Sequence, residues 1–529
     1  SAKQEMTQTS EATGNRREFL EAIFHYNRAF KAHHINGTLK YSQDAYKTTV
    51  EVDDIKDGIA KRHMGLAGRA SYNWNYRYFA DFNFGYNGSE NFAKGNRFGF
   101  FPSIAAGWIV SEEEFMRPVQ NYINKLKLRA SYGLAGNDRF YNDDGSQKRF
   151  AYITTIGTTD GYKWGNSNAF YDKGGLREGD PGVESLTWET VKKANVGIEL
   201  GLFKMAELQV DFFHERREDI FMQRKNIPSS AGFPSAPWAN YGIVTNKGFD
   251  ISLDLNKQIN KDWFISARAS VTYAKNKIIE QDEDLGVLGT YRSSTGKPVG
   301  QIFGLVNDGL YTEADFEDVT TGKLKPGLPV PKFSDRVYPG DIKYLDLNGD
   351  NEITETDKTV IGGTVNPELV YGFGINLSYK NIDFGAFFQG NGRTYRIIGE
   401  NQKNFLPGST IGAEGNIFTN ASDAWTVDNP SQDVFYPRLH MGYNANNAQV
   451  SDWWLKDMSM LRLKNVELGY SFSKNLIKKA AMEYARIFVR GTNLLQFSKF
   501  DLWDPELNTS NGLKYPIMAT YSIGLQVRF

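Results

Sequence analysis

Cysteine is absent from this 529-residue sequence, so neither a disulfide framework nor a thiolate metal site can form. An excess of one charge is absent as well, since 61 basic residues face 62 acidic ones and the formal net charge is −1. Nucleic acid as a partner would need a basic stripe, and the balance indicates none. No stretch approaches the roughly 18 apolar residues of a transmembrane helix. Residues 1–17 lack the apolar core of a signal peptide, and we expect an exported form to begin upstream of Ser1.

The motifs of the common enzyme classes are missing too. The six histidines include no HExxH motif and no spacing that suits a zinc site. The glycine-containing run 289–297 has the wrong spacing for a phosphate-binding loop, and Pro298 stands where Ser or Thr is required. No G-x-S-x-G nucleophile elbow occurs. The sequence therefore predicts that the protein is not an enzyme.

What the sequence does contain is β-strand alternation. Aromatic residues make up 14% of the chain, and glycine occurs 51 times. Segments of about ten residues carry an apolar side chain at every second position, which is the pattern of a membrane barrel strand. The pattern recurs over residues 262–275 and 367–379. It is clearest in the last segment, where one face would carry Tyr521, Ile523, Leu525, Val527 and Phe529.

From this alternation we predict fifteen strands, near residues 18–30, 34–47, 65–75, 77–88, 98–110, 125–137, 190–202, 206–216, 247–257, 262–275, 367–379, 381–391, 459–472, 482–494 and 517–529. The connections alternate between short and long, as in outer-membrane barrels with short periplasmic turns and long extracellular loops. The long ones are predicted at 48–64, 89–97, 138–189, 217–246, 276–366, 392–458 and 495–516. The predicted fold is all-β, a transmembrane antiparallel up-and-down β-barrel.

Two short connections on the periplasmic side are predicted to be helical. Residues 111–114, Ser-Glu-Glu-Glu, have the form of a capping box, and residues 475–482 are rich in helix formers. Aromatic residues gather near strand ends, where an interfacial girdle would place them: Trp74, Tyr76, Tyr78 and Tyr86. The alternative is that these rings belong to the core of a soluble β-protein.

Short motifs between the strands form a series along nearly the whole chain. In the N-terminal half they are Arg77-Tyr-Phe-Ala80, Asn87-Gly-Ser-Glu-Asn-Phe-Ala93, Arg97-Phe-Gly-Phe-Phe-Pro-Ser103, Lys125-Leu-Lys-Leu-Arg-Ala-Ser-Tyr-Gly133, Gly136-Asn-Asp138, Leu186-Thr-Trp-Glu189 and Asn195-Val-Gly-Ile198. In the C-terminal half they are Asn246-Lys-Gly-Phe249, Asp341-Ile-Lys-Tyr344, Leu461-Arg-Leu-Lys-Asn465, Leu468-Gly-Tyr470, Asn493-Leu494 and Asp504-Pro-Glu506. By their order and spacing the series resembles the SusC/RagA family of TonB-dependent outer-membrane transporters.

The resemblance implies a barrel in the outer membrane of a Gram-negative, Bacteroidetes-like bacterium. It implies import of oligosaccharides or oligopeptides, gated by an N-terminal plug, driven by the TonB system and assisted by a SusD-like surface lipoprotein. We find no plug domain or TonB box in residues 1–529, so energy coupling would depend on a segment outside this sequence. Transporters of this class close at about 22 strands, and an open sheet edge cannot face lipid. We therefore expect an N-terminal segment or another chain to complete the barrel, with Ser1 on the extracellular side.

The sharpest local motif is an EF-hand-like segment, residues 346–357, within the long loop 276–366. Its positions 1, 3, 5 and 12 carry oxygen donors, and position 7 would offer a backbone carbonyl to Ca²⁺. Ile353 would anchor the loop, while Asn351 stands where Gly is usual and position 12 is Asp rather than Glu. The alternative is an Asp/Asn turn satisfied by its own backbone. The candidate metal ligands are Asp346, Asn348, Asp350, Glu352 and Asp357.

Ligand contacts would come from the loops 217–246, 276–366 and 392–458, which carry Trp238, Tyr241, Trp425 and Tyr443. An aromatic face can stack on a sugar or pack on a peptide side chain, so these rings do not decide the substrate class. Trp453 and Trp454 precede a strand, where they would equally suit a membrane interface. We expect Phe529 to belong to an assembly signal in the final strand, with a girdle aromatic as the alternative.

Two other functions stay open. One is a passive outer-membrane channel or adhesin on a similar barrel, and the other is a secreted β-rich glycan-binding protein or hydrolase. Alternation and loop spacing support a transporter and a channel equally. Only the motif series favours the transporter.

Overall fold

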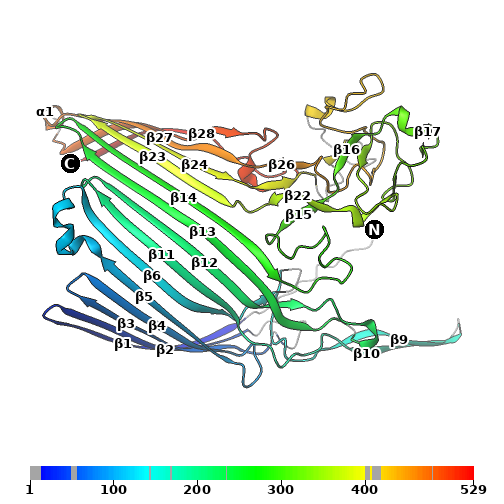
Figure 1. Cartoon of the computed structure of the whole chain (residues 1–529), viewed down its shortest axis with the longest axis horizontal. Helices are drawn as coiled ribbons and strands as arrows, with labels where there is room; N and C mark the ends of the chain where they lie inside the picture. The colour runs from blue at the N-terminus through cyan, green and yellow to red at the C-terminus, as the bar shows by residue number, and fades with distance from the viewer. Residues whose placement is uncertain are drawn as a thin grey trace, which may run out of the picture. The chain divides into compact units, whose positions relative to one another are not determined.

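The computed structural model describes residues 14–48, 56, 58–141, 145–166, 169–233, 235–399, 405–407, 419–478 and 481–529. The chain forms two compact units, in each of which strands dominate (Figure 1). Unit 1 comprises Ser1–Lys204, Gln209–Lys247 and Ile278–Leu285, and unit 2 comprises Met205–Leu208, Gly248–Lys277 and Gly286–Phe529. Within these residues no helix has both the length and the apolar character to cross a membrane.

Fifteen strands form one sheet in which neighbours in the sequence are neighbours in the sheet. They are β1 (Asn15–Phe30), β2 (His33–Thr48), β3 (Lys61–Trp74), β4 (Tyr78–Ser89), β5 (Phe98–Ile109), β6 (Ile123–Asn137), β11 (Glu189–Leu202), β12 (Ala206–Gln223), β13 (Trp238–Gln258), β14 (Trp263–Glu280), β23 (Leu369–Tyr379), β24 (Ile382–Gly392), β27 (Met460–Ser471), β28 (Tyr484–Ser498) and β29 (Thr520–Arg528). Each coincides with a predicted strand, and the all-β, antiparallel up-and-down prediction is confirmed. The predicted position of Ser1 falls outside the described residues.

The register explains why alternation found these strands. In β14 and β23 the apolar residues lie directly opposite one another, from Trp263 and Tyr379 at one end to Tyr273 and Leu369 at the other. Since successive side chains point to opposite faces, one face of the pair is continuously apolar. Leu525 in β29 faces Ile487 in β28 in the same way. Such a face is what a lipid-exposed barrel wall requires.

The predicted strand ends are wrong on the side of the long loops. β12 reaches Gln223 and β13 begins at Trp238, so strands occupy much of the predicted loop 217–246. β14 likewise continues to Glu280. Beyond the membrane both faces of a strand meet water or loop, so apolar alternation fades while backbone pairing continues. Hydrophobic periodicity therefore stops short of the true strand ends.

The turn after β5 is helical, but not as predicted. It consists of two 3₁₀ helices, η1 (Val110–Glu112) and η2 (Glu114–Val119), and Ser111 is buried inside the first rather than capping a helix. The carboxylate of Glu113 instead accepts hydrogen bonds from neighbouring strands, and its partners are Arg77 (3.0 Å), Tyr78 (2.5 Å) and Trp108 (3.0 Å). A capping box that begins at Ser111 would use the carboxylate of Glu114, which lies 3.4 Å from Arg117 in an exposed ion pair instead, so the capping-box prediction is wrong.

The second predicted helix is confirmed in part, because α1 covers only Lys474–Ile477 and residues 479–480 lie outside the described residues. Rings gather as predicted at the short turns on the opposite side from the long loops. Trp74 stacks on Tyr78 at 5.4 Å between ring centroids, and Tyr78 stacks on Trp108 at 6.2 Å. Trp74, Tyr76 and Tyr78 are all exposed, as girdle residues would be.

The long loops carry short strands and 3₁₀ helices of their own. In unit 1 these are β7 (Phe140–Tyr141), β8 (Gln147–Lys148), β9 (Ile156–Asn166), β10 (Ala169–Glu178) and η3 (Ser229–Ala231). In unit 2 they are β15 (Gln301–Gly304), β16 (Asn307–Leu310), η4 (Glu313–Asp315), β17 (Phe316–Asp318), β18 (Lys323–Leu324), β19 (Val330–Pro331), β20 (Ile342–Tyr344), β21 (Glu352–Ile353), η5 (Glu355–Asp357), β22 (Thr359–Thr364), β25 (Tyr395–Ile397), η7 (Thr419–Ser422), β26 (Leu455–Asp457) and η9 (Pro505–Leu507).

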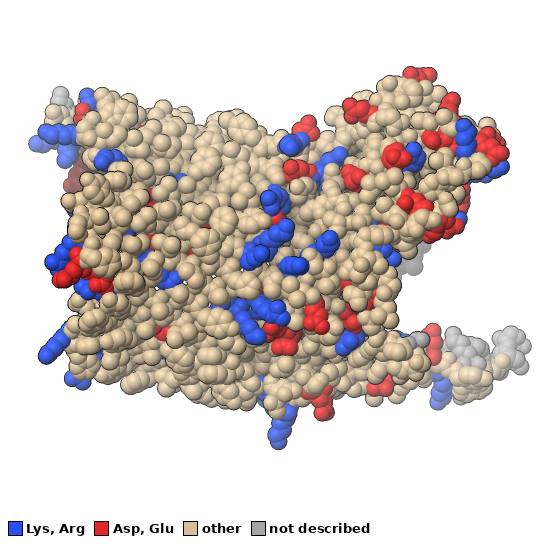
Figure 2. Space-filling model, in the orientation of Figure 1, with Lys and Arg blue, Asp and Glu red and all other residues tan. Residues whose placement is uncertain are grey.

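The loops of unit 2 share a hydrophobic core, which we call the loop core. Trp425 and Trp454 are buried in it, and Trp453 packs against it. The membrane-interface reading of Trp453 and Trp454 is therefore wrong. In Figure 2 the charged side chains of this unit crowd its loop region, whereas the face over β23 and β24 is mostly uncharged. The residues of the loop core are Leu305, Leu310, Ile342, Tyr344, Ile353, Ile397, Ile398, Phe405, Ala424, Trp425, Tyr436, Trp454, Met458 and Phe500.

Candidate functional site

In unit 1, motifs that lie far apart in the sequence meet at the base of the loops. Phe92 is fully buried and packs against Trp188, with 5.3 Å between the ring centroids. The side chain of Asn91 donates to the carbonyl of Asp138 at 3.0 Å, and the indole of Trp188 donates to the carbonyl of Arg97 at 3.2 Å. Four motifs of the series thus form one hydrophobic and hydrogen-bonded cluster.

A buried carboxylate fixes the loop between β12 and β13 in the same unit. Asp282 accepts hydrogen bonds from the Arg224 guanidinium at 2.7 Å, the Lys225 backbone N–H at 2.7 Å and the Asn226 amide at 2.9 Å. Burial alone would raise the pKa of Asp282, but these donors outweigh it and lower the pKa to about 2. The carboxylate is therefore charged, and the loop bound to it, throughout the neutral range.

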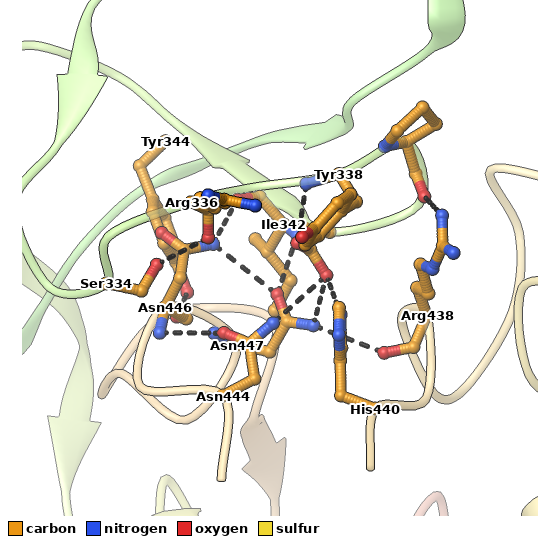
Figure 3. A network of polar contacts seen from close by, with 12 residues as sticks. Ser334, Arg336, Tyr338, Ile342, Tyr344, Arg438, His440, Asn444, Asn446 and Asn447 are labelled. Atoms are coloured by element: carbon orange, nitrogen blue, oxygen red, sulfur yellow. Dashed lines mark hydrogen bonds and ion pairs between the residues drawn. The ribbon is translucent and has the colours of Figure 1, made fainter. Parts of the chain in front are cut away.

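In unit 2 the fully buried side chain of Asp341 organises the loops. Figure 3 labels its partners Tyr338, His440, Asn444 and Asn447. One oxygen lies 2.5 Å from His440 Nε2 and accepts from the side-chain amides of Asn447 at 2.8 Å and Asn444 at 3.2 Å. The other oxygen accepts from the Tyr338 backbone N–H at 2.8 Å. One carboxylate therefore ties residues 338–344 to residues 438–447, which we call the Asp341 network.

Asn446 and Asn447 extend the Asp341 network along the backbone of β20. Asn447 accepts from the Ile342 N–H at 3.0 Å, and Asn446 donates to the Ile342 carbonyl at 2.9 Å. The Tyr344 hydroxyl donates to the Asn446 carbonyl at 2.8 Å, and burial raises the pKa of Tyr344 far above its usual value. Sequence reasoning singled out Asp341 and Tyr344 but missed the asparagines, for which the run Asn444-Ala-Asn-Asn447 was the available signal.

Gly340 shows how tightly this network packs. Its φ is +91°, a region that favours glycine, and an added Cβ would lie 2.3 Å from the ring of Trp425. The Arg438 guanidinium lies over two rings here, with its carbon 5.3 Å from the Tyr338 centroid and 5.7 Å from the Trp425 centroid. The ring of Trp425, a predicted ligand contact, is therefore covered by other residues of the protein.

Two further motifs of unit 2 form a buried ion-pair cluster. Arg462 is 3% exposed, and its Nη2 lies 2.5 Å from each carboxylate oxygen of Asp504. Its Nε lies 3.1 Å from Glu506, which also contacts Lys464 Nζ at 3.1 Å. The cluster joins the beginning of β27 to η9, so the motifs Leu461–Asn465 and Asp504–Glu506 act as one structural element.

The predicted cation loop, residues 346–357, folds as a closed turn. Asp346 accepts from the N–H groups of Gly349 at 2.7 Å and Asn351 at 2.8 Å. Asp357 closes the loop by accepting from Leu347 N–H at 3.0 Å. Asn351 has a φ of +62°, so it takes the left-handed conformation that the missing glycine would have supplied.

The other loop positions follow the same scheme. The side chain of Asn348 accepts a hydrogen bond from the Asp350 N–H at 2.8 Å. The side chain of Asp350 accepts one from the Glu352 N–H, also at 2.8 Å. Ile353 is fully buried in the loop core, as predicted for an anchor. Where β21 pairs with β19, the N–H groups of Val330 and Lys332 donate to the carbonyls of Asn351 and Ile353. Glu352 lies between these two residues.

The loop carboxylates act on one neighbouring tyrosine. The Tyr291 hydroxyl donates to the Thr356 carbonyl at 2.6 Å, and burial together with the charges of Asp357, Asp346 and Asp350 raises the pKa of Tyr291. Burial alone would raise the pKa of Asp346, but hydrogen bonds from the backbone N–H groups of Gly349 and Asn351 hold it below its usual value. Among the described residues no three His, Cys, Asp or Glu side chains already converge as a metal centre.

The remaining candidate ligand aromatics differ in access. Trp238 stacks on Phe221 with 4.5 Å between centroids and carries Lys148 Nζ 4.7 Å from its own ring centroid. The Arg224 guanidinium carbon lies 4.5 Å from the Tyr241 ring centroid. Tyr443, at 49% exposed, is the most accessible of the four. These contacts hold loops in place, and they assemble no nucleophile and base among the described residues.

No family model matches this chain. It is 30% identical over 489 residues to TonB-dependent receptor P26 of Formosa agariphila, covering 87% of this chain and 46% of that receptor. It is 25% identical over 474 residues to TonB-dependent receptor SusC of Bacteroides thetaiotaomicron, covering 87% of this chain and 43% of SusC. The chain thus spans about half the length of the curated relatives it matches.

Among solved structures, a chain of the RagAB peptide importer in its closed-closed state has a TM-score of 0.69 with this chain. The two are 21% identical, and the match covers 97% of this chain and 56% of the other. At that identity the likeness concerns the fold. The shared fold is all-β and built on a large antiparallel sheet, which agrees with the fold class predicted from alternation.

Proposed function

We propose, on the premise that this chain is a SusC/RagA-like TonB-dependent receptor of the bacterial outer membrane, that it belongs to an active importer of oligopeptides or oligosaccharides. The observation that carries the proposal is the similarity to TonB-dependent receptor P26, which extends over 87% of the chain. Its relatives are named as receptors rather than enzymes. In this proposal energy coupling comes from the TonB system through a plug domain outside residues 1–529.

The proposal includes a SusD-like surface lipoprotein as partner and a preorganised loop region that binds it. The Asp341 network and the Arg462 cluster both support this, because each fixes long loops whose backbones would otherwise lose entropy on binding. Peptides are the first substrate class to test, since the RagAB neighbour is a peptide importer. Oligosaccharides are the second.

The test is uptake by the native organism after deletion of the gene that encodes this chain. We expect accumulation of a labelled oligopeptide or oligosaccharide pool to fall to background, while uptake of single amino acids and monosaccharides stays unchanged. Disrupting TonB in the parent strain should abolish the same uptake. Uptake that survives without TonB would indicate a passive channel, and unchanged uptake with lost attachment would indicate an adhesin.

We further propose that residues 346–357 bind Ca²⁺ through side-chain oxygens of Asp346, Asn348, Asp350 and Asp357 and the carbonyl of Glu352. The support is the loop closure by Asp357, the left-handed Asn351 and the joint field of three carboxylates at Tyr291. A bound Ca²⁺ would offset the mutual repulsion of these carboxylates. Binding requires Asn348 to turn its oxygen inward in place of the amide nitrogen that now contacts Thr356.

Adding Ca²⁺ to the complete protein should release heat in calorimetry and slow proteolysis within residues 346–357. The double variant Asp346→Asn/Asp350→Asn should lose both effects, because it removes two of the three charges that attract the ion. Asp318→Asn is the matched control, since Asp318 caps a solvent-exposed turn of the same unit by accepting from Thr320 at 2.9 Å. No heat in the parent protein, or the same heat in all three proteins, would refute the site.

A further inference from the structure

The apolar face of β14 and β23 has a length that can be compared with a membrane. Trp263 and Tyr273 mark its two ends and are ten residues apart. At about 3.4 Å per residue this spans about 34 Å, and a strand tilt of about 40° reduces the height to about 26 Å. The lipid-facing band of outer-membrane barrels is about 25 Å tall and ends in aromatic girdles. Tyr273 therefore stands where hydrocarbon gives way to lipid headgroups on the side of the long loops.

Cations follow directly after Tyr273 on the same face. The alternation of β14 places Lys275 two residues beyond Tyr273, and Lys277 two residues further on, and both are exposed. Basic side chains also gather over the loop-side end of β14 in Figure 2. A long basic side chain at this level lies beside hydrocarbon and reaches into the headgroup layer.

Arg393, just after β24, completes a compact group with these residues. Its Nη1 lies 3.2 Å from the Tyr273 hydroxyl, and its guanidinium carbon lies 5.4 Å from the centroid of that ring. The carboxylate of Glu368 lies 3.3 Å from Arg393 and 4.0 Å from Lys275. Two cations, 58% and 49% exposed, thus share one carboxylate that is 15% exposed, and the group keeps a net positive charge.

Unit 1 independently contains the same arrangement. On β11 an apolar face that includes Val196 and Ile198, both exposed, ends at Lys192 near the long loop. Lys192 Nζ lies 2.5 Å from Glu218, and Arg216 Nε lies 2.6 Å from the same carboxylate. Here too, two partly exposed cations share one carboxylate at the loop-side end of an apolar face. Because the same group recurs at the loop-side end of two apolar faces, we infer that its role depends on its depth in the membrane.

We propose that the Lys275/Arg393 group and the Lys192/Arg216 group bind phosphate groups of anionic glycolipids in the outer leaflet of the membrane. The proposal rests on the outer-membrane location. Lys and Arg are the side chains that pair with phosphate, and a cation near an anionic lipid surface gains about a factor of five in binding. The occupant is a lipid rather than a soluble anion, because each group continues a face that only hydrocarbon can cover. Such contacts fix the depth of the barrel in the leaflet.

The experiment uses the complete purified transporter and two kinds of vesicle, phosphatidylethanolamine with phosphorylated lipid A and phosphatidylethanolamine with dephosphorylated lipid A. Native mass spectrometry after extraction measures retained lipid A. The variants are Lys275→Gln/Arg393→Gln and Lys192→Gln/Arg216→Gln. The control is Arg268→Gln, because Arg268 lies on β14 but on the opposite face, 2.5 Å from Asp254. Heat-modified mobility verifies that each variant folds.

We expect each double variant to retain about half as much phosphorylated lipid A as the parent, because one of the two groups stays intact, and the control to retain as much as the parent. Dephosphorylated lipid A should be retained weakly and equally by all four proteins. Equal retention of phosphorylated lipid A by all four would overturn the proposal. So would displacement by equimolar inorganic phosphate, which would assign the groups to a soluble anion. Lipid retention needs no transport, so this outcome is independent of the proposed import.

Discussion

Replacing Asp341 with asparagine is expected to detach residues 438–447 from β20 and to speed amide hydrogen exchange in both segments roughly a hundredfold. The carboxylate is fully buried and receives His440, Asn444, Asn447 and the Tyr338 N–H. Asparagine has the same shape but presents an NH₂ group to donors, so at least one buried donor loses its acceptor. Breaking such a charged, buried network costs about 3 kcal/mol, which corresponds to that factor in local opening.

The measurement is hydrogen exchange followed by mass spectrometry, with peptides of β23 as an internal reference. Asp335→Asn is the control, because Asp335 is an exposed carboxylate of the same loop. The control should exchange like the parent protein. Unchanged exchange of residues 438–447 in Asp341→Asn would mean that the loop core alone holds this segment.

Replacing Arg462 with methionine should free the segment after β28 and expose it to protease between residues 499 and 515. Methionine keeps most of the buried volume but leaves Asp504 and Glu506 close together with only Lys464 for compensation. Removing one partner of a buried ion pair costs about 3–5 kcal/mol. Phe500 and Trp503 would then leave the loop core, and tryptophan emission should shift to longer wavelength.

Lys464→Met is the matched comparison, because Lys464 is 25% exposed and contacts only Glu506. A partly exposed pair of this kind contributes about 1 kcal/mol or less, so proteolysis should change little. The two variants remove the same formal charge two residues apart. If they behaved alike, net charge rather than the buried geometry of Arg462 would hold the segment.

Strands and membrane face could be predicted because their signal is local. The register of β14 and β23 puts Trp263, Val271 and Tyr273 on one face, as alternation alone had indicated. The same argument misplaced the loop-side end of β12, since no apolar face is needed above the membrane. It could not decide the place of Trp454, because an aromatic side chain before a strand looks the same in the sequence whether it meets lipid or a loop core.

The amino-acid sequence by itself determined which segments are strands, which face of each is apolar and which short motifs belong together as a series. Period-two alternation and motif spacing are properties of neighbouring residues. Only the tertiary structure decided that Arg462 meets Asp504 across 42 residues, that Asn447 meets Asp341 across 106, and that Glu368 lies between Lys275 and Arg393. Such pairs depend on strand register and on how long loops pack onto a common core, and neither is encoded within one segment.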